Sequence, residues 1–218
     1  MGMRINQYIA LATGMSRRQA DTLVQQGRVE VNGKAAVLGM EIHPGTQVLI
    51  NGQTVSPPAD VMTILLNKPV GYVCSRDGQG SKTIYDLLPR DLHHLKPIGR
   101  LDKDSSGLLL LTNDGTLAHE LTHPRFEKQK VYEIELAKDL DDSDKTAIGQ
   151  GVELNDGLSR LKLEGSGQKW TVTMSEGRNR QIRRTFEVVG NKVTCLERKQ
   201  FGQYTLEDLD SGKYKVLT

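Results

Sequence analysis

A polar stretch just before a run of four leucines contains the residues best suited to catalysis. Residues 99–112 read GRLDKDSSGLLLLT, so that Arg100, Asp102 and Asp104 crowd a short loop ahead of an apolar, strand-like segment. A buried strand would hold such a loop rigidly, and a carboxylate that acts as nucleophile or general base needs that rigidity. On spacing alone, a strand-entry loop whose charged side chains only form ion pairs fits equally well.

A second polar cluster, EGRNRQIRR at residues 176–184, concentrates positive charge. Four arginines lie within seven residues: Arg178, Arg180, Arg183 and Arg184. Guanidinium groups match phosphate oxygens in pairs, so the cluster is suited to a nucleic-acid backbone. The apolar Ile182 indicates that a helix begins inside the cluster, which would turn one arginine inward toward the sheet. For Arg178 and Arg184, a solvated helix face explains the pattern as well as RNA contact does.

Two further segments are less specific by themselves. Lys68 lies in NKPVG at residues 67–71, where a strand breaks into a turn, and Tyr132 lies in the alternating strand-like segment 131–134. A single tyrosine on a strand belongs to the hydrophobic core more often than to a catalytic site.

Strand-like runs recur beyond residue 61, with helix-like patterns between them. The strand-like runs are residues 62–66, 107–112, 131–136, 169–174 and 192–196, and the helix-like ones are 83–88, 115–121 and 144–148. This order predicts a mixed sheet with flanking helices. The loop that contains Asp102 would enter one strand of that sheet, and Tyr132 would lie on another.

The first part of the chain has a different pattern. A helix over residues 4–11 is followed by the capping box Ser16–Gln19, which predicts the start of a second helix. Asn-Gly pairs at residues 32–33 and 51–52 predict tight hairpin turns. The prolines at 57 and 58 favour a short, stiff linker. We therefore expect one domain over residues 1–58 and another over residues 59–218.

Composition narrows the class of protein. The 218 residues are 37% hydrophobic and 26% charged with a net charge of +2, as in ordinary soluble domains, so a nucleic-acid partner would be met by local basic clusters. No apolar run is long enough to span a membrane, and we expect a cytoplasmic protein. His119 and His123 lack the HExxH pattern, and the two cysteines have no ligand spacing, so we expect no metal site.

Four segments together resemble a known family. KPVG at 68–71, GRLDKDSSGLLLLT at 99–112, KVYEIEL at 130–136 and EGRNRQIRR at 176–184 are similar, in this order, to the motifs of bacterial pseudouridine synthases that modify single sites in ribosomal RNA. The N-terminal segment resembles the small α/β RNA-binding domain first named from ribosomal protein S-four. The resemblance implies an α+β fold with a mixed, largely antiparallel sheet and no cofactor. It also implies a monomeric enzyme whose partner is structured RNA, either ribosomal RNA or a pre-ribosomal particle.

The resemblance also implies roles for individual residues. Asp102 would be the catalytic carboxylate and Arg183 the inward arginine that pairs with it. Tyr132 would pack on the flipped base, and whether it also removes the final proton stays open. The residues expected to bind substrate are Arg100, Leu196, Lys68, Arg178, Arg180 and Arg184 in the catalytic domain and Arg17, Arg18, Arg28 and Lys34 in the N-terminal domain.

Several alternatives remain at this point. The substrate could be transfer RNA or small-subunit ribosomal RNA, although EGRNRQIRR resembles the large-subunit branch more closely. A non-catalytic module of ribosome assembly would also use arginine clusters. Such a module has no reason to bury an ionised aspartate, whereas a synthase must present Asp102, Tyr132 and Arg183 in one basic cleft.

Overall fold

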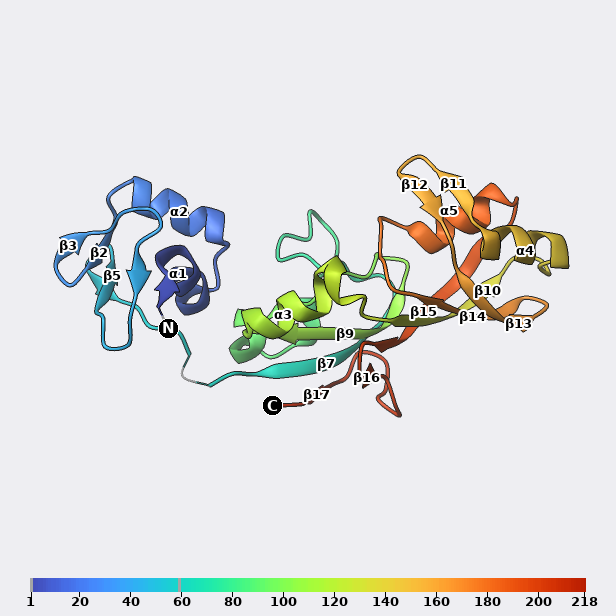
Figure 1. Cartoon of the computed structure of the whole chain (residues 1–218). Coiled ribbons are helices and arrows are strands. Elements are labelled where there is room, and N and C mark those ends of the chain that lie inside the picture. The colour runs from blue at the N-terminus through green and yellow to red at the C-terminus, as the bar shows by residue number, and fades with distance from the viewer. Residues whose placement is uncertain (1, 59) are drawn as a thin grey trace. The chain divides into compact units, whose positions relative to one another are not determined.

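The computed structural model describes residues 2–58 and 60–218 (Figure 1). Two compact units make up the chain: Met1–Met62 with Arg90–Lys96, and Thr63–Pro89 with Pro97–Thr218. The domain boundary expected between residues 58 and 59 falls at Ala59, which lies outside the described residues, so that boundary stays a prediction.

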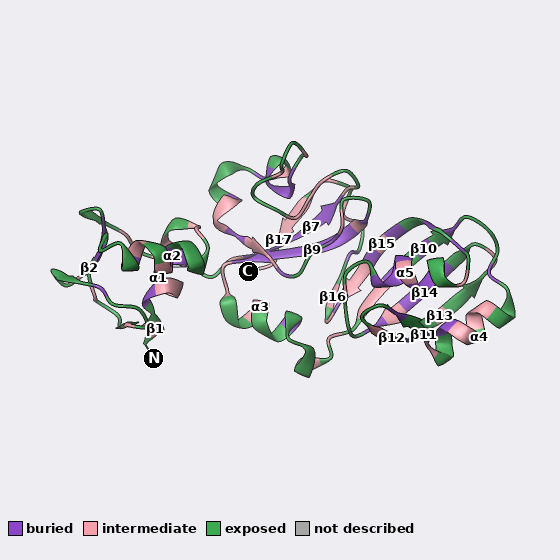
Figure 2. Ribbon diagram, turned by 90° about the horizontal axis from the view of Figure 1, so that it is seen from above, coloured by how far each residue is buried: buried purple, intermediate pink, exposed green. Residues whose placement is uncertain are grey.

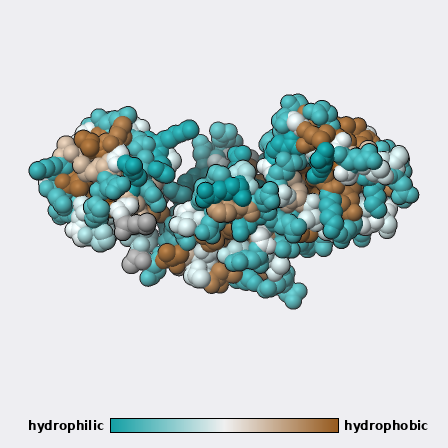
Figure 3. Space-filling model, in the orientation of Figure 1, coloured by the Kyte–Doolittle hydropathy of each residue, from teal (hydrophilic) through white to brown (hydrophobic). Residues whose placement is uncertain are grey.

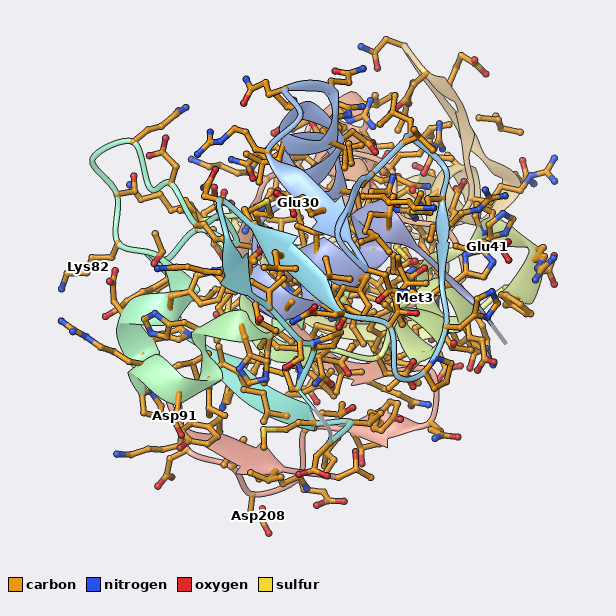
Figure 4. The ribbon with its side chains drawn as sticks, turned by 90° about the vertical axis from the view of Figure 1, so that its left-hand side faces the viewer. Met3, Glu30, Glu41, Lys82, Asp91 and Asp208 are labelled. Carbon is orange, nitrogen blue, oxygen red and sulfur yellow. The ribbon has the colours of Figure 1, made fainter. Side chains whose placement is uncertain are left out.

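The first unit consists of two helices and short strands. Its elements are β1 (Met3–Arg4), α1 (Ile5–Thr13), α2 (Arg17–Gln25), β2 (Val29–Val31), β3 (Lys34–Ala35), β4 (Glu41–Ile42), β5 (Val48–Ile50) and β6 (Gln53–Thr54), with the 3-10 turn η2 (Arg90–His94) grouped with it. Strands β3-β2-β5-β6 form one antiparallel sheet. Strand β1 pairs with β4, with Met3 opposite Ile42 and Arg4 opposite Glu41. Figure 4 labels Met3 and Glu41 on these two strands.

Local sequence signals explain these elements. The side chain of Ser16 accepts a hydrogen bond from the amide of Gln19 and the side chain of Gln19 accepts one in return, so the predicted capping box starts α2. The predicted Asn-Gly turns join β2 to β3 and β5 to β6, with φ of 49° and 51° at Asn32 and Asn51. The helices and strands share a core that includes Ile5, Ile9 and Val48.

The second unit is built on one large sheet. Its strands are β7 (Thr63–Lys68), β9 (Ser106–Thr112), β10 (Lys130–Leu136), β13 (Lys162–Ser166), β14 (Lys169–Met174), β15 (Val193–Phe201), β16 (Tyr204–Thr205) and β17 (Tyr214–Val216). The short strand β8 (Lys96–Pro97) begins with the last residue of the segment Arg90–Lys96 of the first unit. The order is β13-β14-β10-β15-β9-β7-β17, antiparallel throughout except for the parallel pair β15–β9. The predicted mixed, largely antiparallel sheet is thus confirmed.

Helices flank this sheet, as the α+β prediction requires. They are η1 (Ile84–Leu87), α3 (Gly115–Thr122), η3 (Pro124–Phe126), α4 (Asp142–Gln150) and α5 (Gln181–Val188), and the hairpin β11 (Val152–Leu154) and β12 (Gly157–Ser159) lies apart from the main sheet. Helix α3 packs on β9, α4 on β13 and α5 on β11.

The four-leucine run forms the buried strand that the sequence predicted. All of Leu108–Leu111 are 0% exposed in β9, and Figure 2 shows β9 and much of β7 in the colour of buried residues. Both faces of β9 are covered, because successive side chains on a strand point to opposite faces. The loop before β9 therefore starts from a rigid base.

Hydrophilic residues cover most of the face in Figure 3, with small apolar patches between them. No helix within residues 2–58 and 60–218 combines the length and the apolar character needed to cross a membrane.

Candidate active site

A cleft of about 680 Å³ in the second unit brings the predicted catalytic residues together. Asp102 and Arg100 come from the loop before β9, Tyr132 from β10, Arg183 from α5 and Leu196 from β15, and all five line this cleft. The volume lies in the usual range of ligand sites. Segments far apart in the sequence thus meet at one place. An active site requires such a convergence, whereas a loop whose charged residues only form ion pairs does not.

The backbone of the Asp102 loop is held from two sides. The amide of Ser105 donates to the carbonyl of Asp102 over 3.1 Å, which closes a turn. Lys68 Nζ donates to the carbonyls of Asp102 and Ser105 at 3.0 and 2.6 Å. Nη2 of Arg183 donates to the carbonyl of Asp104 at 2.7 Å. Contacts to peptide groups therefore fix the loop and leave the Asp102 carboxylate to the cleft.

Lys68 does not occupy the substrate-contacting position that was expected. Its side chain is 0% exposed, because β7 is covered on both faces and every residue of Thr63–Lys68 is buried. The ammonium group donates to the loop carbonyls and to that of Pro69 at 3.1 Å. Burial lowers the pKa of Lys68. The structure corrects the prediction: Lys68 positions the loop from behind.

The carboxylate of Asp102 is less buried than expected, since its side chain is 37% exposed. The cation that pairs with it is Arg180, with Nη1 at 3.6 Å from Oδ2. Arg180 adopts a left-handed backbone conformation with φ of 47° just before α5, and strained residues of this kind cluster at functional sites. Asp102 thus faces solvent and Arg180 and is not part of a buried ion pair.

The ion pair expected between Asp102 and Arg183 is not present among the described residues. Arg183 Nε lies 3.3 Å from Oδ2 of Asp104, and Nη1 donates to the carbonyl of Val193 at 2.7 Å. These two anchors turn the guanidinium toward the loop backbone two residues beyond Asp102. Hydrogen bonds from Arg180, with help from the Arg183 charge, lower the pKa of Asp104.

Tyr132 and Leu196 lie on neighbouring strands, at the floor of the cleft. The antiparallel register pairs Tyr132 with Arg198 and Ile134 with Leu196, so these side chains share one face of the sheet. Tyr132 is 8% exposed and Leu196 is 7% exposed, and both line the cleft. A planar base that entered here would meet an aromatic ring and an apolar side chain.

Two of the arginines expected at phosphate groups, Arg178 and Arg184, bind a hairpin of the protein. Arg178 donates to Asp156, Gly157 and Leu158, and Arg184 forms an ion pair of 2.8 Å with Asp156. Both guanidinium groups therefore stabilise the turn between β11 and β12. Phosphate contact by Arg178 or Arg184 stays a prediction, whereas their structural role is visible.

The RNA-binding residues expected in the first unit are exposed. Arg17, Arg18, Arg28 and Lys34 all lie at the surface. Arg17 donates to Asn6 and Arg28 to Asn51, which fixes the two guanidinium groups without neutralising them. Their role in binding stays a prediction.

Two cations of the cleft were missed by the sequence analysis. Lys130 Nζ donates to the carbonyls of Ser175 and Glu176, and burial together with the Arg198 charge lowers its pKa. Arg198 is 2% exposed and lines the same cleft. The alternation of side chains along a strand could have indicated both. Lys130 lies two positions before Tyr132, and Arg198 lies two positions after Leu196, so each shares a face of its strand with a residue that was expected in the cleft.

A second groove of the described chain lies apart from the predicted catalytic residues. This groove of about 1000 Å³ beside α4 is lined by Lys145, Arg160 and Lys162 but includes none of the predicted catalytic residues. The rings of His119 and His123 lie 4.8 Å apart, and no group of three metal-ligating side chains occurs in residues 2–58 and 60–218.

Comparison with known proteins identifies the family to which this chain is similar. The family model described as RNA pseudouridylate synthase matches residues 62–188, and the S4 domain model matches residues 3–48. An uncharacterized RNA pseudouridine synthase of Aquifex aeolicus (strain VF5) is 35% identical, over 100% of this chain and 91% of its own. Ribosomal large subunit pseudouridine synthase B of Bacillus subtilis (strain 168) is 36% identical, over 99% and 92%.

A solved structure of a pseudouridylate synthase is similar to this chain in fold. The crystal structure of a pseudouridylate synthase superposes with a TM-score of 0.73 at 33% identity, covering 99% of this chain and 96% of the other. The predicted fold and the predicted resemblance are confirmed. The chain therefore belongs to the RNA pseudouridylate synthase family, with an S4 domain at its N-terminus.

Proposed function

We propose that this enzyme isomerises a specific uridine of large-subunit ribosomal RNA to pseudouridine, with Asp102 as its catalytic carboxylate. The observation that carries the proposal is the convergence of Asp102, Tyr132, Arg183 and Leu196 on one cleft. The choice of RNA rests on relatives, such as that of Bacillus subtilis, that are named for the large ribosomal subunit. We further propose that the enzyme is a monomer and that it works in the cytoplasm, where the large ribosomal subunit is assembled.

The reaction breaks the bond between the sugar and N1 of uracil, turns the base, and rejoins it through C5. Neither energy input nor redox change is needed, since atoms and electrons balance within the nucleotide. The Asp102 carboxylate would either attack the sugar carbon to form an ester or abstract a ribose proton to give a glycal. Both routes require an ionised carboxylate, and the guanidinium of Arg180 lies 3.6 Å from it.

The target uridine must leave its stack before the carboxylate can reach the sugar. Extrusion of a base costs a few kcal/mol, and stacking on an aromatic ring returns about 1–3 kcal/mol. Tyr132 on the cleft floor is placed for that contact, and Leu196 lies on the same face of the sheet. The exposed Arg100 at the cleft is suited to the RNA backbone.

Mapping of pseudouridines in total RNA tests the substrate. Cells that lack this protein should lose modification at one or more uridines of large-subunit ribosomal RNA, and the wild-type protein should restore it. Loss confined to transfer RNA or to small-subunit RNA would contradict the assignment. If the pseudouridines of all three RNAs were unchanged, the result would favour a non-catalytic RNA-binding module over an enzyme that modifies ribosomal RNA.

The N-terminal unit should supply phosphate contacts that make binding depend on salt. We expect the full-length double variant Arg18→Gln, Lys34→Gln to bind structured ribosomal RNA more weakly, with a log–log salt slope smaller by about 0.7–0.9 for each phosphate that is no longer neutralised. Both side chains are exposed. The matched control removes two exposed lysines of the other unit, Lys138→Gln and Lys213→Gln, and should keep the wild-type slope. Equal slopes in all three proteins would show that Arg18 and Lys34 do not bind phosphate.

A further inference from the structure

Arg198, in β15, is a buried cation whose terminal donors lack partners. The residue is 2% exposed, and its Nε donates to the carbonyl of Leu108 at 2.8 Å. Nη2 is buried without a hydrogen-bond partner, and Nη1 donates to no described residue. Buried polar groups are nearly always satisfied, and a charged one left open calls for an explanation. No carboxylate of the described residues forms an ion pair with it.

The side chain is fixed in its place. Its guanidinium carbon lies 4.9 Å from the centroid of the Phe201 ring, close enough for a cation–π contact. Gly107 lets β9 approach β15 in parallel register at Arg198, since a Cβ at Gly107 would collide with the backbone of Arg198. Both β15 and the side chain of Arg198 are therefore fixed, so the unpartnered Nη groups stay at the cleft and do not turn to solvent.

Arg198 lies beside the residues that are expected to contact the flipped base. The register places Arg198 directly opposite Tyr132 and two residues after Leu196, on the same face of the sheet, and all three line the cleft. A base that stacks on Tyr132 would bring its edge to the guanidinium. The exposed Arg100, in contrast, lies where a backbone phosphate can reach it.

The charges around Arg198 favour an incoming anion. Lys68 and Lys130 are its cationic neighbours, and its charge contributes to the lowered pKa of each. The acids of the loop, Asp102 and Asp104, face Arg180 and Arg183. The cleft lining also includes Glu127 and Glu176, and Glu176 acts on Lys130. Six arginine and lysine side chains still face three carboxylates in that lining, so positive charge is in excess.

We propose that Arg198 is a catalytic residue that donates to a carbonyl oxygen of the flipped uracil and stabilises the uracil anion as it leaves the sugar. The proposal rests on the proposed function. When the C1′–N1 bond breaks, its electron pair stays on the base and spreads to the carbonyl oxygens, by the ester route and the glycal route alike. C5 then bonds to C1′, and this step releases the Asp102 carboxylate by the ester route or returns the ribose proton from Asp102 to C2′ by the glycal route. C5 loses its proton to solvent and N1 takes one up, so that the product is an isomer of uridine. Fixed donors aimed at a developing charge are among the strongest catalytic devices.

The test compares full-length wild type, Arg198→Met and Arg198→Lys on a fragment of large-subunit ribosomal RNA. We expect Arg198→Met to lower the single-turnover rate about 100-fold or more, with an RNA dissociation constant within about threefold of wild type. Arg198→Lys should recover part of the rate. The control Lys199→Met removes the next cation of β15, which pairs with Glu133 and Glu197 outside the cleft, and should keep the wild-type rate.

A change of leaving group makes the test specific. RNA with 5-fluorouridine at the target carries a base whose anion is more stable, so the deficit of the Arg198 variants in cleaving the C1′–N1 bond should shrink. Cleavage is followed as loss of the nucleoside on chromatography after digestion. An equal deficit for both bases, or weaker RNA binding at an unchanged rate, would overturn the proposal and indicate a phosphate contact. If Arg198→Met does not fold, Arg198→Lys carries the same comparison. Wild-type inactivity on this RNA would instead overturn the proposed function.

Discussion

Asp102→Asn should fold like the wild type and lose turnover by about 10⁴-fold or more, the scale on which enzymes lose rate when a residue that acts in the reaction is removed. The amide keeps the shape of the side chain but can neither attack the sugar nor take its proton. Folding should be unaffected, because the loop is held through the carbonyl of Asp102 and its side chain is 37% exposed. The measurement is release of tritium from C5 of uracil in substrate RNA, beside a thermal unfolding curve.

Asp104→Asn is the matched control for Asp102→Asn. Asp104 pairs with Arg180 and Arg183, two residues from the proposed catalytic group, so its replacement should disturb positioning and reduce turnover less. Turnover by Asp102→Asn within about tenfold of wild type would remove Asp102 from the chemistry.

Lys68→Met should cost both stability and activity. The substitution leaves the carbonyls of Pro69, Asp102 and Ser105 without their buried donor, and a buried group left without its partner costs about 1–3 kcal/mol. The methionine also removes a buried charge, which offsets part of that cost. Activity should fall by about 100-fold, because a displacement near 1 Å of a catalytic group has effects of that size.

Unfolding midpoints and single-turnover rates measure the two effects of Lys68→Met. Lys103→Met is the control on the same loop, since Lys103 is exposed and its Nζ donates to Ser81 Oγ, away from the loop carbonyls. Wild-type midpoint and rate in Lys68→Met would show that the loop keeps its place without this cation.

Local signals in the sequence predicted much of the fold. The Ser16–Gln19 capping box and the two Asn-Gly turns appear where expected, because each depends on residues only a few positions apart. The leucine run predicted β9 because a strand covered on both faces has no polar positions. These features need no knowledge of the rest of the chain.

The pairings within the site could not be predicted in the same way. Arg183 turns to Asp104 because Val193, ten positions away on the next strand, fixes its guanidinium, and no local pattern encodes that contact. Lys68 ends a strand that alternation alone would leave half exposed, and only the covering of both faces turns it inward. The resemblance indicated Asp102, Tyr132 and Leu196 as residues of one cleft, but it misplaced Lys68 and did not indicate Arg198.

The attachment of the catalytic loop through peptide groups has a practical consequence. Because Lys68 and Arg183 bind the carbonyls of Asp102, Ser105 and Asp104, we expect that replacing the proposed catalytic side chain at position 102 leaves the shape of the cleft intact. A chain altered there would engage its target and stall before product, which makes it a capture reagent. Crosslinking and sequencing of the RNA retained by such a chain would report the modified position directly.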